Sequence, residues 1–362
     1  MKVPFLDLTV SNTKIKKELL TSVEEVLSHG RIILGPEVQK FEEKIAEYCN
    51  RKFAVGTNSG TDALYFALRA LDIGVGDEVI TTPLSWIATV NAIVLTGAKP
   101  VFVDVRNDLN INPDLIKDAI TKKTKAILPV HFTGNMCDMS KVNDIAQRNN
   151  LIVVEDAAQA FGSKLNDKPS GSFGHIACFS MNPMKVLNAY GEAGAIVTDD
   201  KIIYEKLVSL RYAGTINKED CHFPSLNGRI DTIQTAMLLV VMKYVDDKIN
   251  SRRKIANYYN QEISDIVGCP ISDKTCSHSY YSYTITTDNR DELQLFLADN
   301  GIETKIQHPI LMPYHTAYKG QYKHIIPIAE KLVKQILCLP AHENLGKNEQ
   351  NYVVSKLRMF FN

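Results

Sequence analysis

Three short segments carry polar side chains that could act on one ligand, and each follows an apolar run. In the first, residues 57–63, Gly60 and Thr61 open an expected helix. Small and hydroxyl residues there let backbone N–H groups face an anion such as a phosphate. The alternative is an ordinary helix cap made by the hydroxyl of Ser59 or Thr61. No lysine follows the glycine and no G-x-G-x-x-G follows a strand, so neither a Walker loop nor a dinucleotide-binding fingerprint is indicated.

The second segment, residues 153–159, places two acids at the end of an apolar run. Glu155 and Asp156 are followed by Ala-Ala and then by Gln159. In a parallel sheet the carboxyl end of a strand is where a functional carboxylate would project. The alternative is that Asp156 caps the next helix, which is the more ordinary reading of such a pair taken alone.

The third segment, residues 178–185, runs from a strand through a turn to Lys185. Apolar neighbours would desolvate this lysine, which favours the neutral amine that attacks carbonyl carbons. The alternative is a solvated surface lysine. Trp86 follows another expected strand end, where a flat aromatic could stack on a ring, or it could be a core residue.

Together the three segments supply what pyridoxal phosphate (PLP) needs from a protein. A helix start would bind the phosphate, Lys185 would form the Schiff base, and Asp156 would keep the pyridine nitrogen protonated. No one of the segments indicates this cofactor by itself; their combination does.

The elements that must position these residues alternate between short strands and helices. Strands are expected at residues 53–55, 78–82, 101–105, 126–130, 151–155, 175–180 and 194–198. Helices are expected at residues 13–29, 37–48, 61–72, 86–95, 113–120 and 139–149. Such alternation predicts a mostly parallel sheet covered on both faces, with a ligand beyond the carboxyl ends of its strands.

A long helix is expected from residue 231 to about residue 264, leaving the first domain. The remainder reads as strand 280–286, helix 290–300, strand 302–307, helix 327–335 and a last helix near 350–359. We therefore predict an α/β protein with a large PLP-binding domain at residues 1–245 and a small C-terminal α/β domain at residues 246–362.

Composition excludes several other classes of protein. The 362 residues hold 41 basic and 41 acidic side chains, which argues against nucleic acid or a membrane surface as partner. The seven cysteines are scattered and form no Cys-x-x-Cys, so neither disulfides nor a zinc cluster is expected. The histidines lack close metal-ligand spacing, so no metal site is expected. No signal peptide or membrane span is apparent, and a cytoplasmic location is predicted.

Residues 58–64, residues 155–159 and Phe179-Ser180 with Lys185 resemble the DegT/DnrJ-type sugar aminotransferases. The likeness extends to residues 4–8, 33–37, 76–80 and 98–104, and so covers nearly the whole chain. This family consists of PLP enzymes of the aspartate aminotransferase fold, fold type I. The resemblance implies that fold, with a large domain of mostly parallel sheet and a small C-terminal α/β domain.

The resemblance also implies roles for single residues. Lys185 matches the lysine that binds the cofactor covalently and is the catalytic residue. The implied cofactor contacts within one chain are Gly60, Thr61 and Ser180 at the phosphate, Trp86 and Gln159 at the ring, and Asp156 at the ring nitrogen. The resemblance also implies a homodimer with shared active sites, in which Asn227 reaches the phosphate from the other subunit. Arg229 and His308 match positions near the substrate, and a structural loop histidine is an equal alternative for His308. His315 is expected to be structural or solvated.

The implied reaction is amination of a keto group on a nucleotide-linked deoxysugar, with L-glutamate as the amino donor. Residues 33–38 and 305–310 look more like the branch that aminates C-3 than the branch that aminates C-4. Residues 181–184 and Ala193 depart from the usual family pattern, which bears on substrate fit. The alternatives are a sugar dehydratase, disfavoured because its lysine is replaced by histidine, and a non-catalytic PLP-fold regulatory protein.

Overall fold

The computed structural model describes residues 1–362, and its centre is a sheet of seven strands in the order β1-β9-β8-β5-β4-β2-β3. Neighbours are parallel except β9, which is antiparallel to both β1 and β8. The strands are β1 (Phe53–Thr57), β2 (Glu78–Thr81), β3 (Lys99–Phe102), β4 (Thr124–Leu128), β5 (Ile152–Asp156), β8 (Ile176–Ser180) and β9 (Gly194–Thr198). The predicted mostly parallel sheet is therefore confirmed.

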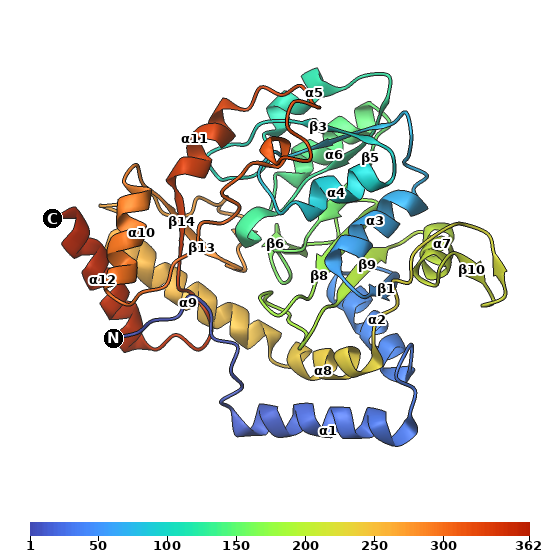
Figure 1. The fold of residues 1–362 in the computed structure, drawn as a ribbon, viewed down its shortest axis with the longest axis horizontal. Coiled ribbons are helices and arrows are strands. Elements are labelled where there is room, and N and C mark those ends of the chain that lie inside the picture. The colour runs from blue at the N-terminus through green and yellow to red at the C-terminus, as the bar shows by residue number, and fades with distance from the viewer.

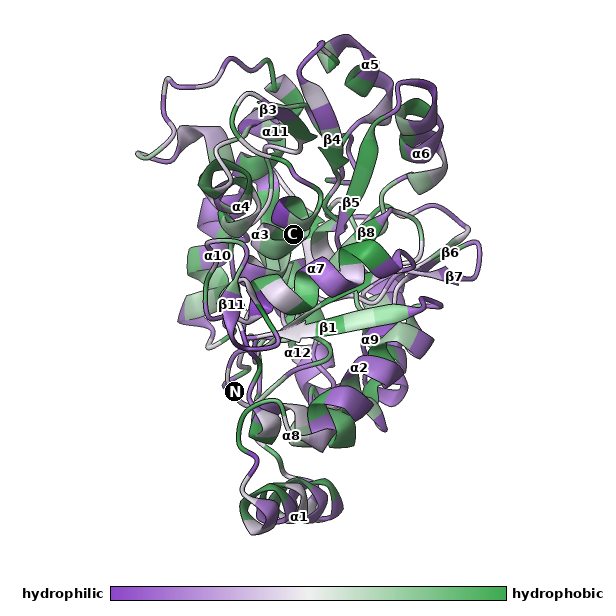
Figure 2. Ribbon diagram, turned by 90° about the vertical axis from the view of Figure 1, so that its right-hand side faces the viewer, coloured by the Kyte–Doolittle hydropathy of each residue, from purple (hydrophilic) through white to green (hydrophobic).

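Both faces of this sheet are buried, because successive side chains of its strands enter different cores. Ala54 and Ala177 belong to one apolar cluster, whereas Val55 and Cys178 belong to another. One face is covered by α3 (Gly60–Ala70), α4 (Ala88–Leu95) and α7 (Lys201–Arg211). The other is covered by α2 (Pro36–Tyr48), α5 (Ile116–Ala119), α6 (Met139–Arg148) and α8 (Thr232–Met242). Figure 2 shows β5 as hydrophobic over most of its length, whereas the surrounding helices carry both hydrophobic and hydrophilic residues.

Helix α9 (Val245–Ile263) runs from the central sheet to a second, smaller layer (Figure 1). There β13 (Tyr283–Thr286) pairs antiparallel with β14 (Ile336–Leu339). These strands share an apolar core with α9, α10 (Arg290–Asp299) and α12 (Lys347–Phe361), and α11 (Pro327–Gln335) precedes β14. The predicted domain boundary at residues 245/246 falls in the first turn of α9 and stays a prediction.

Short elements complete the chain. They are the 3-10 turns η1 (Pro113–Leu115), η2 (Phe132–Gly134) and η3 (Met312–Tyr314), and the strands β6 (Lys164–Leu165), β7 (Lys168–Pro169), β10 (Thr215–Ile216), β11 (Asp220–Cys221) and β12 (Cys276–Ser277). Strand β12 pairs with β6, which links the smaller layer back to the larger one. No helix in the structure combines the length and the apolar character needed to cross a membrane.

The first residues of the chain join the two layers. Val3 bridges to Ile302, and the N–H of Phe5 donates to Glu303, 298 residues away. Helix α1 (Thr13–His29) then packs along α8, below the rest of the molecule in Figure 1. Between these two attachments, residues 6–12 form part of the wall of a 140 Å³ cavity whose opposite side includes Lys185.

Two predictions about the second half of the chain were wrong. The expected long helix is interrupted after α8, because Tyr244 leaves helical geometry and its hydroxyl donates to Glu18 of α1. The expected strand at residues 302–307 is absent. Ile302 and Lys305 make only single bridges, to Val3 and to Cys338, which belong to different segments, so no continuous ladder can form.

Candidate active site

A cavity of about 530 Å³ opens beyond the carboxyl ends of the central strands. Most of the residues expected to bind cofactor or substrate line it. They are Gly60, Thr61, Trp86, Asp156, Gln159, Ser180, Lys185 and His308. Asn227 and Arg229 do not line the cavity of their own chain. The expectation that these strand ends converge on one pocket agrees with this geometry.

The start of α3 forms one wall of the cavity and has the shape of an anion cradle. Ser59 is the cap, since its hydroxyl accepts the N–H of Asp62 at 3.1 Å. The first N–H groups of a helix have no intrahelical acceptor, so those of Gly60 and Thr61 can serve a ligand. Glycine is required at position 60, because a Cβ there would lie 2.6 Å from the Cβ of Ser180 at the end of β8. Capping and anion binding are therefore compatible at this helix start.

Asp156 is the last residue of β5 and is buried at the bottom of the cavity. One carboxylate oxygen accepts the hydroxyl of Thr89 at 2.8 Å, and the other accepts the N–H of Ala158 at 3.2 Å. No helix begins after Asp156, so the capping alternative was wrong. Burial raises the pKa of this carboxyl, against the opposing effect of the hydrogen bond from Thr89. A cationic ring nitrogen would be a favourable partner for such an acid.

Gln159 presents a hydrogen-bond donor to the same cavity. Its side-chain oxygen accepts the N–H of Thr133 at 2.8 Å. This bond orients the amide and leaves its NH₂ group as the donor available to a ligand. The position therefore suits an acceptor oxygen on a bound ring.

Lys185 lies half-buried after the β8 turn and extends toward a residue that sequence reasoning missed. Its ammonium nitrogen is 4.4 Å from the centroid of the Tyr281 ring. Burial opposes ionisation of this phenol, but the charge of Lys185 and a hydrogen bond from Gln307 outweigh it, so the pKa of Tyr281 is lowered. Tyr281 lies just before β13, in the smaller layer, and no local motif marks it as part of the site.

Trp86 and His308 lie side by side at the rim of the cavity. Trp86 is 58% exposed, so the alternative of a core aromatic was wrong. Its ring centroid is 5.6 Å from that of His308, which also packs 5.8 Å from Phe132. Burial, followed by the charges of Lys185 and Lys305, lowers the pKa of His308 to about 3, so its imidazole is neutral at neutral pH. His315, expected to be structural or solvated, also lines the cavity.

Asn227 and Arg229 lie on the outer surface beside the start of α3. The side-chain oxygen of Asn227 accepts from Arg229 at 2.7 Å, and the Arg229 guanidinium lies 4.6 Å from the centroid of the Tyr212 ring. The backbone of this segment is fixed, because Thr57 bridges to Arg229. The side chains of Asn227 and Arg229 therefore lie next to the start of α3 but outside the cavity of their own chain.

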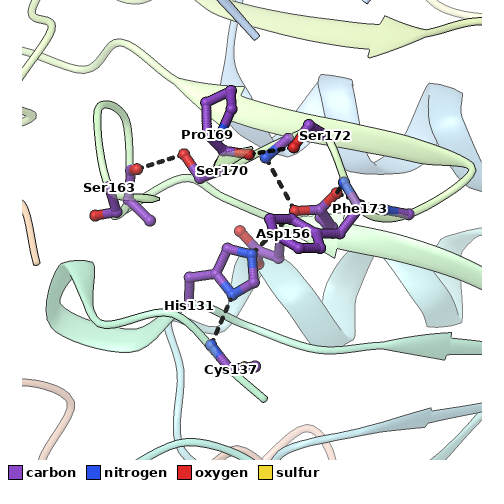
Figure 3. A network of polar contacts seen from close by, with 12 residues as sticks. His131, Cys137, Asp156, Ser163, Pro169, Ser170, Ser172 and Phe173 are labelled. Carbon is purple, nitrogen blue, oxygen red and sulfur yellow. Dashed lines mark hydrogen bonds and ion pairs between the residues drawn. The ribbon is translucent and has the colours of Figure 1, made fainter. Parts of the chain in front are cut away.

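Glu155 points away from the cavity, on the opposite side of β5 from Asp156. It is fully buried and accepts the backbone N–H groups of Gly171, Phe173 and Gly174 at 2.6–2.9 Å. One ring nitrogen of His131 lies 3.1 Å from the Glu155 carboxylate. The other ring nitrogen accepts the N–H of Cys137 (Figure 3). Burial alone would raise the pKa of Glu155, but these bonds lower it. The two neighbouring acids therefore have different roles, and Glu155 holds the 171–174 loop.

The residues of the cavity fit pyridoxal phosphate. The cradle between Gly60 and Ser180 has no room for a further Cβ, the buried carboxylate of Asp156 lacks a full counter-charge, and Lys185 lies within reach of both. When bound, this cofactor supplies an electron sink that stabilises a carbanion at the carbon next to its imine. No cluster of three or more His, Cys, Asp or Glu side chains is arranged to hold a metal ion.

Comparison with known proteins agrees with this site. The model of the DegT/DnrJ/EryC1/StrS aminotransferase family matches residues 13–358. The dTDP-3-amino-3,6-dideoxy-α-D-galactopyranose transaminase of Aneurinibacillus thermoaerophilus is 38% identical, with 99% of each chain covered. The pleiotropic regulatory protein of Geobacillus stearothermophilus is 40% identical, covering 100% of this chain and 99% of the relative. The solved structure of NtdA from Bacillus subtilis with bound PMP is 30% identical, with a TM-score of 0.93 over 99% of this chain and 85% of NtdA.

The chain belongs to the DegT/DnrJ/EryC1/StrS aminotransferase family. It has the fold of that family, fold type I, and is a PLP-dependent aminotransferase. The predicted family, fold and cofactor are thereby confirmed.

Proposed function

We propose that the chain transfers an amino group from L-glutamate to the C-3 keto carbon of a nucleotide-linked deoxysugar. The observation that carries the proposal is the meeting of Lys185, Asp156 and the Gly60–Ser180 cradle in one cavity of about 530 Å³. Trp86, which lines the cavity, is 58% exposed, and this supports access for a substrate that extends into solvent. The name of the Aneurinibacillus relative describes a 3-amino sugar nucleotide, which supports the substrate class and the carbon.

Each residue has a proposed task in this reaction. Lys185 binds the cofactor and, once released, moves a proton between cofactor and substrate carbons as base and then acid. Asp156 keeps the ring nitrogen protonated, and Gln159 donates to the ring oxygen. Gly60, Thr61 and Ser180 hold the phosphate.

Trp86 covers the ring from the rim, and His308 contacts the sugar as a neutral donor or acceptor. The preference for C-3 rests on residues 33–38 and 305–310. All six residues of the second stretch line the cavity, where a sugar would lie. The first stretch does not reach the cavity of its own chain.

The test of the reaction is product analysis by NMR. Purified enzyme is given glutamate with the 3-keto or the 4-keto form of a dTDP- or UDP-linked hexose, and we expect faster amination of the 3-keto form. Nitrogen found only on C-4 would reverse the choice of carbon. No product with any keto-sugar nucleotide would remove the proposed substrate class.

The test of the catalytic lysine is chemical. Borohydride should fix the cofactor to the peptide that contains Lys185, and a label on another lysine would overturn the assignment. A visible spectrum with and without glutamate separates a transaminase, whose cofactor changes form, from a regulator that only binds it.

We also propose a homodimer with shared active sites, in which Asn227 and Arg229 complete the partner's cavity. Their place on the outer surface beside the cradle supports this arrangement. Mixing Lys185→Ala and Asn227→Ala chains should regenerate one intact site per mixed dimer. If both parent variants are dimeric and nearly inactive, an inactive mixture counts against shared sites.

A further inference from the structure

Lys305 is a second cation in the wall of the active-site cavity and has no carboxylate partner. The lysines that pair with acids lie elsewhere in the structure. The two acids of the cavity are Asp156, held by Thr89, and Glu192, which accepts from Asn182 at 2.6 Å. A cation left unpaired in a substrate cavity is a site for an anionic group of a ligand.

The backbone of Lys305 is held against the second strand of the smaller layer, which fixes the position from which its side chain starts. Its N–H donates to Cys338 at 3.1 Å, and its carbonyl accepts from Cys338 at 2.8 Å. The next residue, Ile306, packs against the core of the smaller layer. Lys305 itself lines the active-site cavity.

Tyr281 connects Lys305 to the reacting centre. The phenol ring contacts Lys185, and the charges of both lysines act on its buried hydroxyl, against the effect of burial. Lys305 and Lys185 therefore act on the same phenol and line the same cavity. A ligand whose amino group replaces the amine of Lys185 could place a carboxylate at Lys305.

The structure assigns Lys305 as the residue that binds a carboxylate of the amino donor; this assignment rests on the proposed function. The phosphate cradle at Gly60 and Ser180 lies on the other domain and is already assigned to the cofactor. In a nucleotide sugar the hexose ring separates the diphosphate from the reacting carbon, which places those anions further out, toward the rim at Trp86. A small amino acid has its carboxylates within a few bonds of the reacting carbon, and Lys305 lines the same cavity as Lys185.

The experiment separates the two half-reactions. Lys305→Met, Lys305→Arg and, as matched control, the exposed Lys334→Met are compared with the parent enzyme. Conversion of the PLP form by glutamate, and of the amine form by the keto-sugar nucleotide, are followed by single-turnover absorbance. Binding of glutarate, which has both carboxylates of the donor and no amino group, is measured separately by calorimetry on holoenzyme.

Lys305→Met should raise the apparent Kd for glutamate and for glutarate roughly ten-fold, as expected for loss of one charge-assisted hydrogen bond. The keto-sugar half-reaction should stay within about two-fold, Lys305→Arg should retain most of the affinity, and Lys334→Met should match the parent. Unchanged glutamate and glutarate affinities in Lys305→Met would overturn the inference, and so would a loss confined to the keto-sugar half-reaction. Failure of the parent enzyme to aminate any keto sugar, with glutamate conversion intact, would remove the proposed acceptor and leave Lys305 testable.

Discussion

The ammonium nitrogen of Lys185 lies 4.4 Å from the centroid of the Tyr281 ring, so the lysine that we propose as the cofactor's covalent partner packs on an aromatic face from the smaller layer. A cation over such a face is stabilised by about 0.5–2 kcal/mol, depending on its exposure to water. When the lysine is released during transamination, this face can hold its amine near the reacting carbon. The contact therefore links the position of Lys185 to that of the smaller layer.

Replacing Tyr281 tests this contact. Tyr281→Phe keeps the aromatic face and should retain the glutamate half-reaction within about three-fold, whereas Tyr281→Leu should lose roughly ten-fold. Single-turnover absorbance measures both rates, and cofactor content is checked by release in alkali. Equal losses in the two variants would show that the hydroxyl, and not the ring, is the important group.

Asp156→Asn should have opposite effects on the free and the cofactor-bound protein. Burial raises the pKa of Asp156, so the folded apoenzyme holds this proton more tightly than the unfolded chain does. Its contribution to the free energy of unfolding therefore falls as the pH rises above the ordinary value of 3.8 toward the raised one. Asparagine does not ionise, so the Asp156→Asn variant does not lose this part of the free energy of unfolding as the pH rises. Its apoenzyme should be at least as stable as the parent at neutral pH. Cofactor should raise the Tm of the parent more than that of the variant, and transamination should fall by far more than the ~1 kcal/mol of a neutral hydrogen bond.

The Tm of both apoenzymes is measured across a range of pH. The difference between the two Tm values reports on Asp156 alone, because the other buried acids are present in both proteins. If cofactor raises the Tm of the parent and of Asp156→Asn equally, the partner of the ring nitrogen is a different residue.

Gly60→Ala should weaken cofactor binding without unfolding the protein. The new methyl group would lie 2.6 Å from the Cβ of Ser180, so the start of α3 must move away from β8 and open the phosphate cradle. We expect a rise of at least ten-fold in the Kd for PLP, measured by absorbance titration, for the loss of about one phosphate hydrogen bond. Gly74→Ala is the control, because a Cβ there meets only the carbonyl of Thr96 at 3.5 Å. Similar PLP affinities in the two variants would argue against the cradle.

Glu155→Gln should destabilise the fold while leaving the cavity residues in place. The variant replaces an anion that accepts three backbone N–H groups, contacts His131 and lies 3.8 Å from the guanidinium of the buried Arg51 side chain. Removing one charge of a buried ion pair costs about 3–5 kcal/mol. Bonding lowers the pKa of Glu155 despite burial, so its contribution is present above the ordinary value of 4.5 and is lost as the pH falls through the lowered one. Denaturant unfolding at neutral pH and near pH 3 should show the difference between parent and variant shrinking in acid. The exposed Glu47→Gln serves as control, and equal stability of the two variants would contradict this role.

Asp156 and Lys185 could be assigned to one cavity from the sequence because Asp156 ends a buried strand and Lys185 follows the turn after another, and the sheet brings those two strand ends together. The helix start at Gly60 was predictable for the same reason. Tyr281 and Lys305 could not be found this way, since their contacts depend on how the smaller layer lies against the larger one. The two-residue period of strands and the 3.6-residue period of helices do not show how the two layers pack against each other.

The error at residues 302–307 has a related cause. The alternation of side chains there is that of a strand, but the partners that would make a ladder belong to two different segments. Tyr280 adopts a left-handed conformation, so β13 begins three residues later than predicted, at Tyr283. Local pattern indicates which segments are extended, whereas pairing is decided by distant residues.

The attachment of Phe5 to Glu303 also bears on the order of folding. Forming this bond closes a loop of 298 residues, and the entropy lost on closure grows with loop length. Contacts of such high sequence separation form after local ones, so residues 3–12 should dock only when both sheets exist. The 140 Å³ cavity that residues 6–12 form next to Lys185 is then completed late in folding. The cradle at Gly60 and Ser180 and the carboxylate of Asp156 belong to the central sheet, so we expect them to be formed before the N-terminal segment docks.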